Sequence, residues 1–302
     1  MEVFVLNRDL PRLGFIGAGT VATALACALH GKGYPVMAVA SRSFSSAQRV
    51  AKLIPDCRPC PYKQQVIDCS DIIFITTPDD VIARVAGELR WQAGKSAVHC
   101  SGADSSGILS KAKSDGAQTG VFHPLQTFAG AQRTAEALYG ITFSLEAEEP
   151  LLTQLKQMAE ALGGRWFVLI PDARVLYHAS AVMVSNYLVT LVKLATELWP
   201  DFGVTREEAT RALLPLIKGT VNNIETLGLP GCLTGPISRG DTGTLKKHLQ
   251  ALSKRHNVIT SAYCELGLQT VPVALKKGRI DASKAQEIVS ILSNSASERS
   301  KT

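Results

Sequence analysis

Residues 13–33 read LGFIGAGTVATALACALHGKG. The apolar run Leu13–Gly17 has the length of a strand, and a stretch of helical period, Thr20–His30, follows it and stops at Gly31 and Gly33. The turn between them has the spacing G-x-G-x-x-A, which is informative only with a strand before it and a helix after it. Both are present, so this stretch predicts the first βα unit of a parallel sheet.

Within the turn, Gly17 permits a tight bend, Gly19 lets the backbone approach a pyrophosphate, and Ala22 allows close packing of the helix. The amides at the start of the helix add positive potential for an anion. The turn therefore predicts a dinucleotide site, against the alternative of a glycine turn kept only for packing. The predicted pyrophosphate-binding residues are Gly17, Ala18, Gly19, Thr20 and Val21.

The second apolar run, Pro35–Ala40, is followed by Ser41-Arg42-Ser43. A carboxylate at this position would accept a hydrogen bond from the ribose 2′-hydroxyl of NAD and repel a 2′-phosphate. None is present, and a guanidinium flanked by hydroxyls can hold a phosphate. We expect Ser41, Arg42 and Ser43 to select NADP; the alternative is a solvated arginine on a surface turn.

Residues 1–170 are expected to form an NADP-binding Rossmann domain, a doubly wound parallel sheet of the α/β class. Several of the later apolar runs are continuous and not alternating, as in parallel strands that are buried on both faces. Trp166–Ile170 could add an edge strand. The other runs are Asp71–Thr76, Ser96–Cys100, Thr119–Phe122 and Ile141–Leu145.

Residues 171–302 are expected to form an all-helical domain for substrate binding and dimerisation. Pro171-Asp172 breaks the preceding pattern, and long helical segments follow. Gly228–Gly240 and Gly267–Asp281 are predicted connections. The predicted helices are Ala173–Leu198, Thr205–Thr226, Thr242–Ala262 and Ala282–Leu292.

The composition fits a globular protein, with 302 residues, 46% hydrophobic and 19% charged. The net charge of +6 is spread without runs of like charge, which favours a small anionic ligand and no nucleic acid. The uncharged stretch between His178 and Lys193 is too short to span a bilayer, so we expect a buried helix and no membrane partner.

The N-terminus lacks a signal-peptide pattern, and the seven cysteines lack a disulfide-framework spacing. Both observations favour reduced thiols in a cytoplasmic protein. Cys57-Arg-Pro-Cys60 is a lone C-x-x-C, which we interpret as part of a loop and not as a redox or zinc site. No metal site is expected.

Five further motifs carry a family resemblance. They are Thr76–Asp80, Cys100–Ala103, His123–Phe128, Tyr177-His178 with Ser185-Asn186-Tyr187, and Leu233–Asp241. With them, the chain resembles an uncharacterised family of Rossmann-like NADP oxidoreductases with a helical C-terminal domain, related to pyrroline-5-carboxylate reductase and to the 6-phosphogluconate and β-hydroxyacid dehydrogenases. The resemblance covers nearly the whole chain and implies a C-terminal domain like that of 6-phosphogluconate dehydrogenase.

The resemblance implies that Thr77 and Pro78 contact the cofactor and that Ser101 and Gly102 lie near the nicotinamide. Both segments follow predicted strands, and ligands of open α/β sheets bind at the carboxyl ends of strands. The alternative is that both are ordinary strand-exit turns.

The related dehydrogenases place substrate groups on the first long helix of the second domain, and β-hydroxyacid dehydrogenases use a lysine there. This chain departs from that pattern because it offers His178 and then Ser185 and Asn186. His178 could act as acid or base, with Ser185 or Asn186 holding a remote polar group of the substrate. Alternatively, all three are satisfied polar groups in a packed helix or dimer core.

His123 directly follows a predicted strand and is the rival proton donor. We favour His178 narrowly, because a helix of the second domain could approach the substrate from the face opposite the nicotinamide. The reaction is expected in the cleft between the two domains.

The expected function is an NADP(H)-dependent oxidoreductase that transfers a hydride to or from a small carbonyl or imine, with carboxylate-bearing substrates included. The alternative is a non-catalytic NADP(H) sensor or interaction protein, since a fold does not establish a function. A homodimer is expected, because Ala179–Val192 offers more apolar helix than one small domain can cover.

Overall fold

The computed structural model describes residues 10–128, 136–254 and 256–297. Its chain forms two compact units, residues 1–186 and 187–302. The division lies after Asn186, whereas the boundary predicted from the sequence lies before the first long helix. That helix, α7 (Arg174–Val184), therefore belongs with the sheet.

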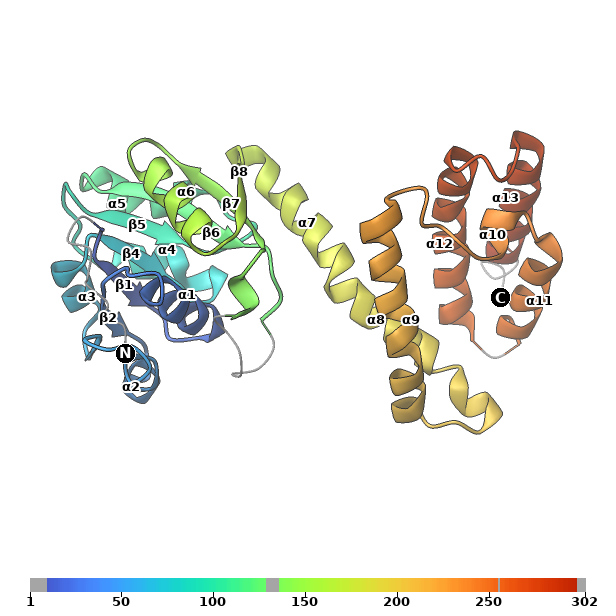
Figure 1. The fold of residues 1–302 in the computed structure, drawn as a ribbon, viewed down its shortest axis with the longest axis horizontal. Coiled ribbons are helices and arrows are strands. Elements are labelled where there is room, and N and C mark those ends of the chain that lie inside the picture. Colours follow the sequence, from blue (N-terminus) through green and yellow to red (C-terminus); the bar gives the residue numbers. More distant parts are fainter. Residues whose placement is uncertain (1–9, 129–135, 255, 298–302) are drawn as a thin grey trace. The chain divides into compact units, whose positions relative to one another are not determined.

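The first unit is built on an eight-stranded sheet in the order β3-β2-β1-β4-β5-β6-β7-β8 (Figure 1). All neighbouring strands are parallel except β6 and β7, which are antiparallel. The predicted Rossmann sheet is confirmed. The strands are β1 (Leu13–Ile16), β2 (Val36–Ala40), β3 (Arg58–Cys60), β4 (Ile72–Ile75), β5 (Ser96–His99), β6 (Gln118–Pro124), β7 (Thr142–Ala147) and β8 (Arg165–Val168).

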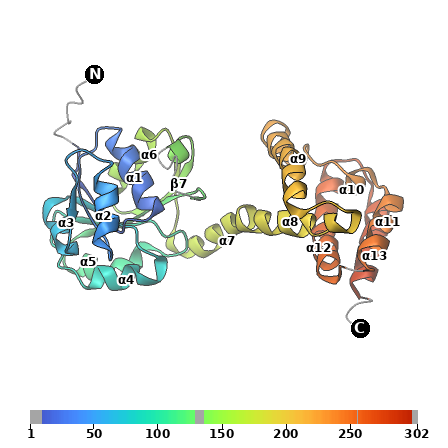
Figure 2. The same cartoon turned by 90° about the horizontal axis from the view of Figure 1, so that it is seen from below.

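Helices cover both faces of the sheet, with α1 and α6 on one face and α3, α4 and α5 on the other (Figures 1 and 2). Each face has its own apolar core, as a doubly wound sheet requires. The helices are α1 (Thr20–His30), α2 (Phe44–Ala51), α3 (Lys63–Cys69), α4 (Asp79–Gly87), α5 (Ser110–Ser114) and α6 (Leu151–Ala161), with 3-10 turns η1 (Ser106–Leu109), η2 (Glu136–Leu138) and η3 (Pro171–Ala173).

One row of stacked rings crosses the core beneath α1 and α6. Phe15 and Phe74 are stacked with ring centroids 5.2 Å apart, and Phe122 and Phe143 are stacked at 4.6 Å. Phe74 meets Phe122 edge to face at 5.9 Å. These rings are fully buried, and so they tie β1, β4, β6 and β7 together across the sheet.

The second unit is helical, as predicted. Its core is formed by α11, α12 and α13, through side chains such as Leu249, Cys264 and Leu292. The helices from the end of the first unit onward are α8 (Asn186–Thr196), α9 (Arg206–Leu227), α10 (Pro236–Arg239), α11 (Thr242–Leu252), α12 (Asn257–Lys276) and α13 (Ala282–Ser297), with the 3-10 turn η4 (Trp199–Phe202).

Four predicted elements are wrong in detail. The loop assigned to Cys57–Cys60 is instead the edge strand β3, which pairs with β2 and has no apolar run because it is three residues long and contains Pro59. The helix predicted over residues 173–198 is interrupted at Ser185, and the one predicted over 242–262 is divided into α11 and α12. The connection predicted from Gly267 lies in α12 as far as Lys276.

In the single chain, side chains of the uncharged stretch between His178 and Lys193 are exposed. Met183 of α7 and Val189 of α8 are 64% and 71% exposed. Residues 171–202 and α12 are apolar and long enough to cross a membrane by length and composition alone. Core helices of other proteins pass the same test, and α12 contributes Cys264 and Val271 to the core.

Candidate functional site

The glycine turn after β1 is held by backbone contacts that exclude a side chain. Gly17 has a φ of +117°, and a Cβ there would lie 2.6 Å from the backbone carbon and oxygen of Thr76. Its N–H donates to the Ala40 carbonyl at 2.8 Å, and the Thr76 N–H donates to the Ile16 carbonyl at 2.8 Å. The carboxyl ends of β1, β2 and β4 thus meet at this glycine.

Gly19 differs from Gly17, because it faces open space. It has extended backbone angles and directly precedes α1, and no atom would lie within 4 Å of a Cβ placed there. Within the described part of the chain, no side chain caps the first amides of α1. Free amides beside open space are the arrangement that a pyrophosphate needs.

The Ser41-Arg42-Ser43 turn follows β2 and leads into α2. Arg42 is exposed, the hydroxyls of Ser43 and Ser45 are 2.8 Å apart, and Arg49 donates to the Ser46 hydroxyl at 2.7 Å. Residues 41–51 contain no carboxylate. The turn therefore offers cations and hydroxyls at the sheet edge that holds the glycine turn.

Thr77 supplies an independent sign of a ligand at this edge. It follows β4, and its hydroxyl oxygen is buried without a hydrogen-bond partner among the described residues. Buried polar atoms nearly always have a partner, so an unpaired one at a strand exit is consistent with a missing ligand. Pro78 next to it directly precedes α4.

The turn after β5 is tightly organised by groups that the sequence did not single out. The Ser101 hydroxyl lies 2.8 Å from Asp79 Oδ2 and 2.9 Å from Asp104 Oδ2 and donates its one proton to either. The Ser101 N–H donates to His99 Nδ1 at 3.2 Å, and His99 Nε2 therefore donates to the Ser105 carbonyl at 3.0 Å. Burial lowers the pKa of His99, which agrees with this neutral tautomer.

Gly102 in that turn lies against both predicted histidines. A Cβ on Gly102 would be 2.6 Å from His178 Cδ2 and 2.9 Å from His123 Nε2. The two rings come from α7 and β6, and their centroids are 6.3 Å apart with nearly perpendicular planes. The structure thus brings His123 and His178 together on Gly102.

Tyr177 and Arg174 join this site, although Tyr177 was named only within a family motif and Arg174 was not expected here. The Tyr177 phenol oxygen is 2.7 Å from His123 Nδ1. Arg174 is fully buried and donates through Nε to Glu146 Oε2 at 2.6 Å. Positions 174, 177 and 178 share one helix face because they are three and four residues apart, and this spacing could have revealed them once His178 was chosen.

The electrostatics of the site keep the His123 ring neutral. Burial, reinforced by the nearby His178, Arg174 and His99, lowers the pKa of His123 to about 4. Burial also raises the pKa of Tyr177, although the neighbouring Ser144 hydroxyl and Arg174 guanidinium partly offset this effect. At neutral pH a protonated phenol therefore faces an unprotonated imidazole.

Ser185 and Asn186 lie farther along the helical segment than His178. Ser185 ends α7 and Asn186 begins α8, so both follow His178 by about two helical turns, roughly 10–12 Å along the axis. Their predicted role toward a substrate stays a prediction.

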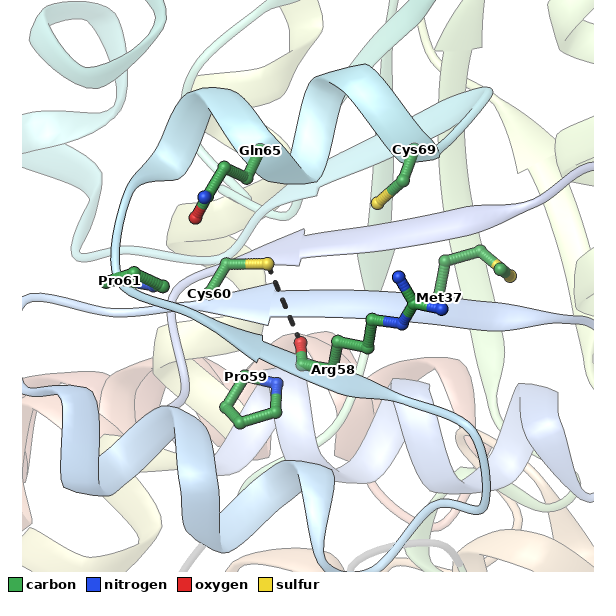
Figure 3. Close-up of a pocket in the computed structure, with 7 residues that line it drawn as sticks. All are labelled: Met37, Arg58, Pro59, Cys60, Pro61, Gln65 and Cys69. Atoms are coloured by element: carbon green, nitrogen blue, oxygen red, sulfur yellow. Dashed lines mark hydrogen bonds between the residues drawn. The ribbon is translucent and has the colours of Figure 1, made fainter.

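A separate hollow of about 340 Å³ lies beside β3 and contains thiols (Figure 3). Burial raises the pKa of Cys60 and raises the pKa of the nearby Cys57 to about 12, so both thiols are poor nucleophiles. No group of His, Cys, Asp and Glu among the described residues could hold a metal ion. The hollow is lined by Met37, Arg58, Pro59, Cys60, Pro61, Gln65 and Cys69.

Two domain families match the chain. Residues 6–124 match a Rossmann-like domain, and residues 141–270 match a domain of unknown function, DUF2520. Comparison with curated protein sequences gives no significant match.

Solved structures resemble nearly the whole chain. A protein from Bacteroides fragilis described as an NADP oxidoreductase is 25% identical, with a TM-score of 0.64, over 82% of this chain and 92% of that one. A Thermotoga maritima protein is 26% identical, with a TM-score of 0.67, over 95% and 99%. Pyrroline-5-carboxylate reductase from Streptococcus pyogenes is 12% identical, with a TM-score of 0.57, over 95% and 99%, and so shows the shared fold.

The two glycines of the first turn should separate folding from cofactor binding. Gly17→Ala should lower the free energy of unfolding by about 2 kcal/mol or more, because alanine is strained at this φ and meets Thr76. Gly19→Ala should leave the melting temperature unchanged and weaken NADPH binding roughly tenfold, because its methyl enters only ligand space. Thermal unfolding and cofactor fluorescence titration measure both. Full NADPH affinity in Gly19→Ala would contradict this assignment.

Proposed function

Since the chain joins a Rossmann-like domain to a DUF2520 domain, we propose that it is an NADP(H)-dependent oxidoreductase acting on a small carbonyl or imine, including carboxylate-bearing ones. The observation that carries the proposal is the convergence of His123 and His178 on Gly102. This turn follows β5 at the carboxyl edge of the sheet, which also holds the dinucleotide turn.

The dinucleotide residues fit the cofactor. The free amides of α1 and the open space at Gly19 would hold the pyrophosphate. The unpaired hydroxyl of Thr77 would form a hydrogen bond with the bound cofactor, and Arg42 would hold the 2′-phosphate. Bound NADPH supplies a hydride. The protein's own residues must then supply the proton that completes reduction of a C=O or C=N bond.

We assign proton donation to His123, although the sequence favours His178. His123 Nδ1 is in hydrogen-bond contact with Tyr177, and its Nε2 faces Gly102. This contact fixes the ring in one orientation, which a proton donor needs. His178, on the other side of the same turn, would contact the substrate.

Turnover is tested by following NADPH oxidation with small 2-oxo acids and cyclic imines. With an active substrate, His123→Gln should lower kcat by ~10²–10⁴ and His178→Gln by less, with NADPH affinity nearly unchanged in both. His248→Gln is the matched control, because His248 also contacts a tyrosine but lies in the second unit. A dead His178→Gln beside an active His123→Gln would reverse the assignment. NADPH binding without oxidation across the panel, together with a co-purifying protein, would support the sensor instead.

Cofactor preference is tested at Arg42. The unaltered protein should bind NADPH more tightly than NADH, and Arg42→Ala should weaken NADPH binding roughly tenfold while leaving NADH binding unchanged. Arg90→Ala is a suitable control, because Arg90 is exposed and precedes β5 at the opposite edge of the sheet. Equal affinities of the unaltered protein for the two cofactors would refute the preference.

A cytoplasmic homodimer completes the proposal. Large apolar side chains are exposed on α8 and α9, among them Val189, Leu216 and Leu227 at 71%, 66% and 62%. Such a concentration of exposed apolar groups favours burial against a second copy. Sedimentation at micromolar concentration should give about twice the chain mass of 32.3 kDa, and a monomer would count against the dimer.

A further inference from the structure

His123 cannot deliver a proton by itself, because its ring is neutral at the pH of the cell. A neutral imidazole that loses its Nε2 proton becomes an imidazolate, which is too basic to form readily. The loss becomes feasible when Nδ1 receives another proton at the same time. Tyr177 is in hydrogen-bond contact with Nδ1, with its phenol oxygen at 2.7 Å.

Burial disfavours both a charged imidazole and a charged phenol, so both rings are neutral and one of them donates to the other. We take the phenol as the donor and Nδ1 as the acceptor, which the tautomer of His123 tests. The ring proton of His123 must then be on Nε2. This nitrogen faces Gly102, where a Cβ would lie 2.9 Å away. The transferable proton is thus on the side of the turn where the substrate is proposed to bind.

Arg174 lies one helical turn before Tyr177 and is fully buried. Its Nε donates to Glu146, but Nη1 and Nη2 have no hydrogen-bond partner among the described residues. Glu146 Oε1 also accepts hydrogen bonds from the N–H and the hydroxyl of Ser106, at 2.8 and 2.7 Å. The guanidinium therefore keeps unused N–H donors in the interior, and its charge acts on both rings.

We propose that Tyr177, His123 and Arg174 form a proton relay in which Tyr177 recharges His123 and Arg174 stabilises the charge that Tyr177 is left with. The Nε2–H bond of His123 breaks as the proton joins the substrate oxygen or nitrogen, and the Tyr177 O–H bond breaks as a new N–H bond forms at Nδ1. The starting state returns when Nε2 takes a proton from solvent and Nδ1 gives its proton back to the phenolate. The relay rests on the proposed function, which provides the hydride acceptor.

Burial and the neighbouring cationic groups disfavour a charged His123 ring. Tyr177, His178 and Arg174 face it from α7, and His99 faces it from β5. Burial is the main cause that lowers the pKa of His123, and the charge of Arg174 and the nearby imidazoles of His178 and His99 add to it, which favours the neutral form that the relay requires. Arg174 also lowers the pKa of Tyr177 against the effect of burial, which eases formation of the phenolate.

Histidine ring NMR on the full-length protein tests the relay without any substrate. In the unaltered protein His123 should be a pure Nε2–H tautomer with a pKa near 4. Tyr177→Phe removes the donor to Nδ1, so the ring should sample both tautomers and its pKa should rise. The matched control is Tyr263→Phe, because Tyr263 contacts His248 Nδ1 at 2.9 Å with a similar perpendicular arrangement of rings. This control should alter His248 and leave His123 unchanged.

The role of Arg174 is tested by the double variant Arg174→Met with Glu146→Gln, which removes both charges and leaves neither one buried alone. The pKa of His123 and that of Tyr177 should both rise, the latter measured as the phenolate absorbance that Tyr177→Phe abolishes. Arg174→Lys keeps the positive charge, so the pKa values of His123 and Tyr177 should stay close to those of the unaltered protein. This variant is also the one to measure if the double variant fails to fold. Unchanged pKa values in the double variant would reduce Arg174 to a structural role.

The two proposals fail in different ways. An Nδ1–H tautomer in the unaltered protein overturns the relay, whether or not a substrate is reduced. Absence of NADPH oxidation with every substrate overturns the proposed function, whatever the tautomer. With an active substrate, Tyr177→Phe should lower kcat by ~10²-fold with little change in KM, and full activity in this variant would overturn the relay.

Discussion

The ion pair between Arg174 and Glu146 fixes where the first long helix after the sheet begins. Glu146 lies on β7, and its carboxylate is shared between Arg174 and Ser106 of η1. Because the guanidinium is fully buried, removing either partner would leave an uncompensated charge in the interior, typically costing about 3–5 kcal/mol. The start of α7 is therefore tied to the sheet, and the side chains one turn later, Tyr177 and His178, are carried to the turn after β5.

The sheet edge then determines which groups meet. Parallel strands end on the same side, so the turns after β1, β2, β4 and β5 are neighbours although they come from residues 17 to 102. Gly17 and Gly102 serve this edge in different ways. At Gly17 the absence of a side chain lets backbone from β4 approach, and at Gly102 it leaves room for two imidazole rings.

Much of this arrangement could be predicted from local sequence. The G-x-G-x-x-A turn, most of the strands and the helical second half follow from apolar runs and glycines, which report on nearby residues. The edge strand β3 could not be predicted, because its three residues pair with β2 and carry no apolar pattern. The interruption at Ser185 and the exposure of α7 and α8 likewise depend on packing, which helical period does not report.

Local sequence pointed to single residues of the candidate site but not to how they meet. His123 and His178 stand out as single polar residues in suggestive places, but their proximity depends on how α7 meets the sheet. Tyr177 was named only as part of a family motif, and Arg174 was missed because arginine side chains are mostly exposed. Their role becomes visible only from burial: Arg174 is 0% exposed, and its charge has one carboxylate partner among the described residues.

The second Tyr–His contact of the molecule shows why geometry alone does not identify a relay. Tyr263 and His248 have an oxygen–nitrogen distance of 2.9 Å and perpendicular rings, much like Tyr177 and His123. However, His248 is exposed on α11 and can exchange protons directly with water. His123 is partly buried beside a guanidinium with unused donors, and its free nitrogen faces a ligand edge. The surroundings, and not the contact alone, therefore suit Tyr177 and His123 to a proton relay.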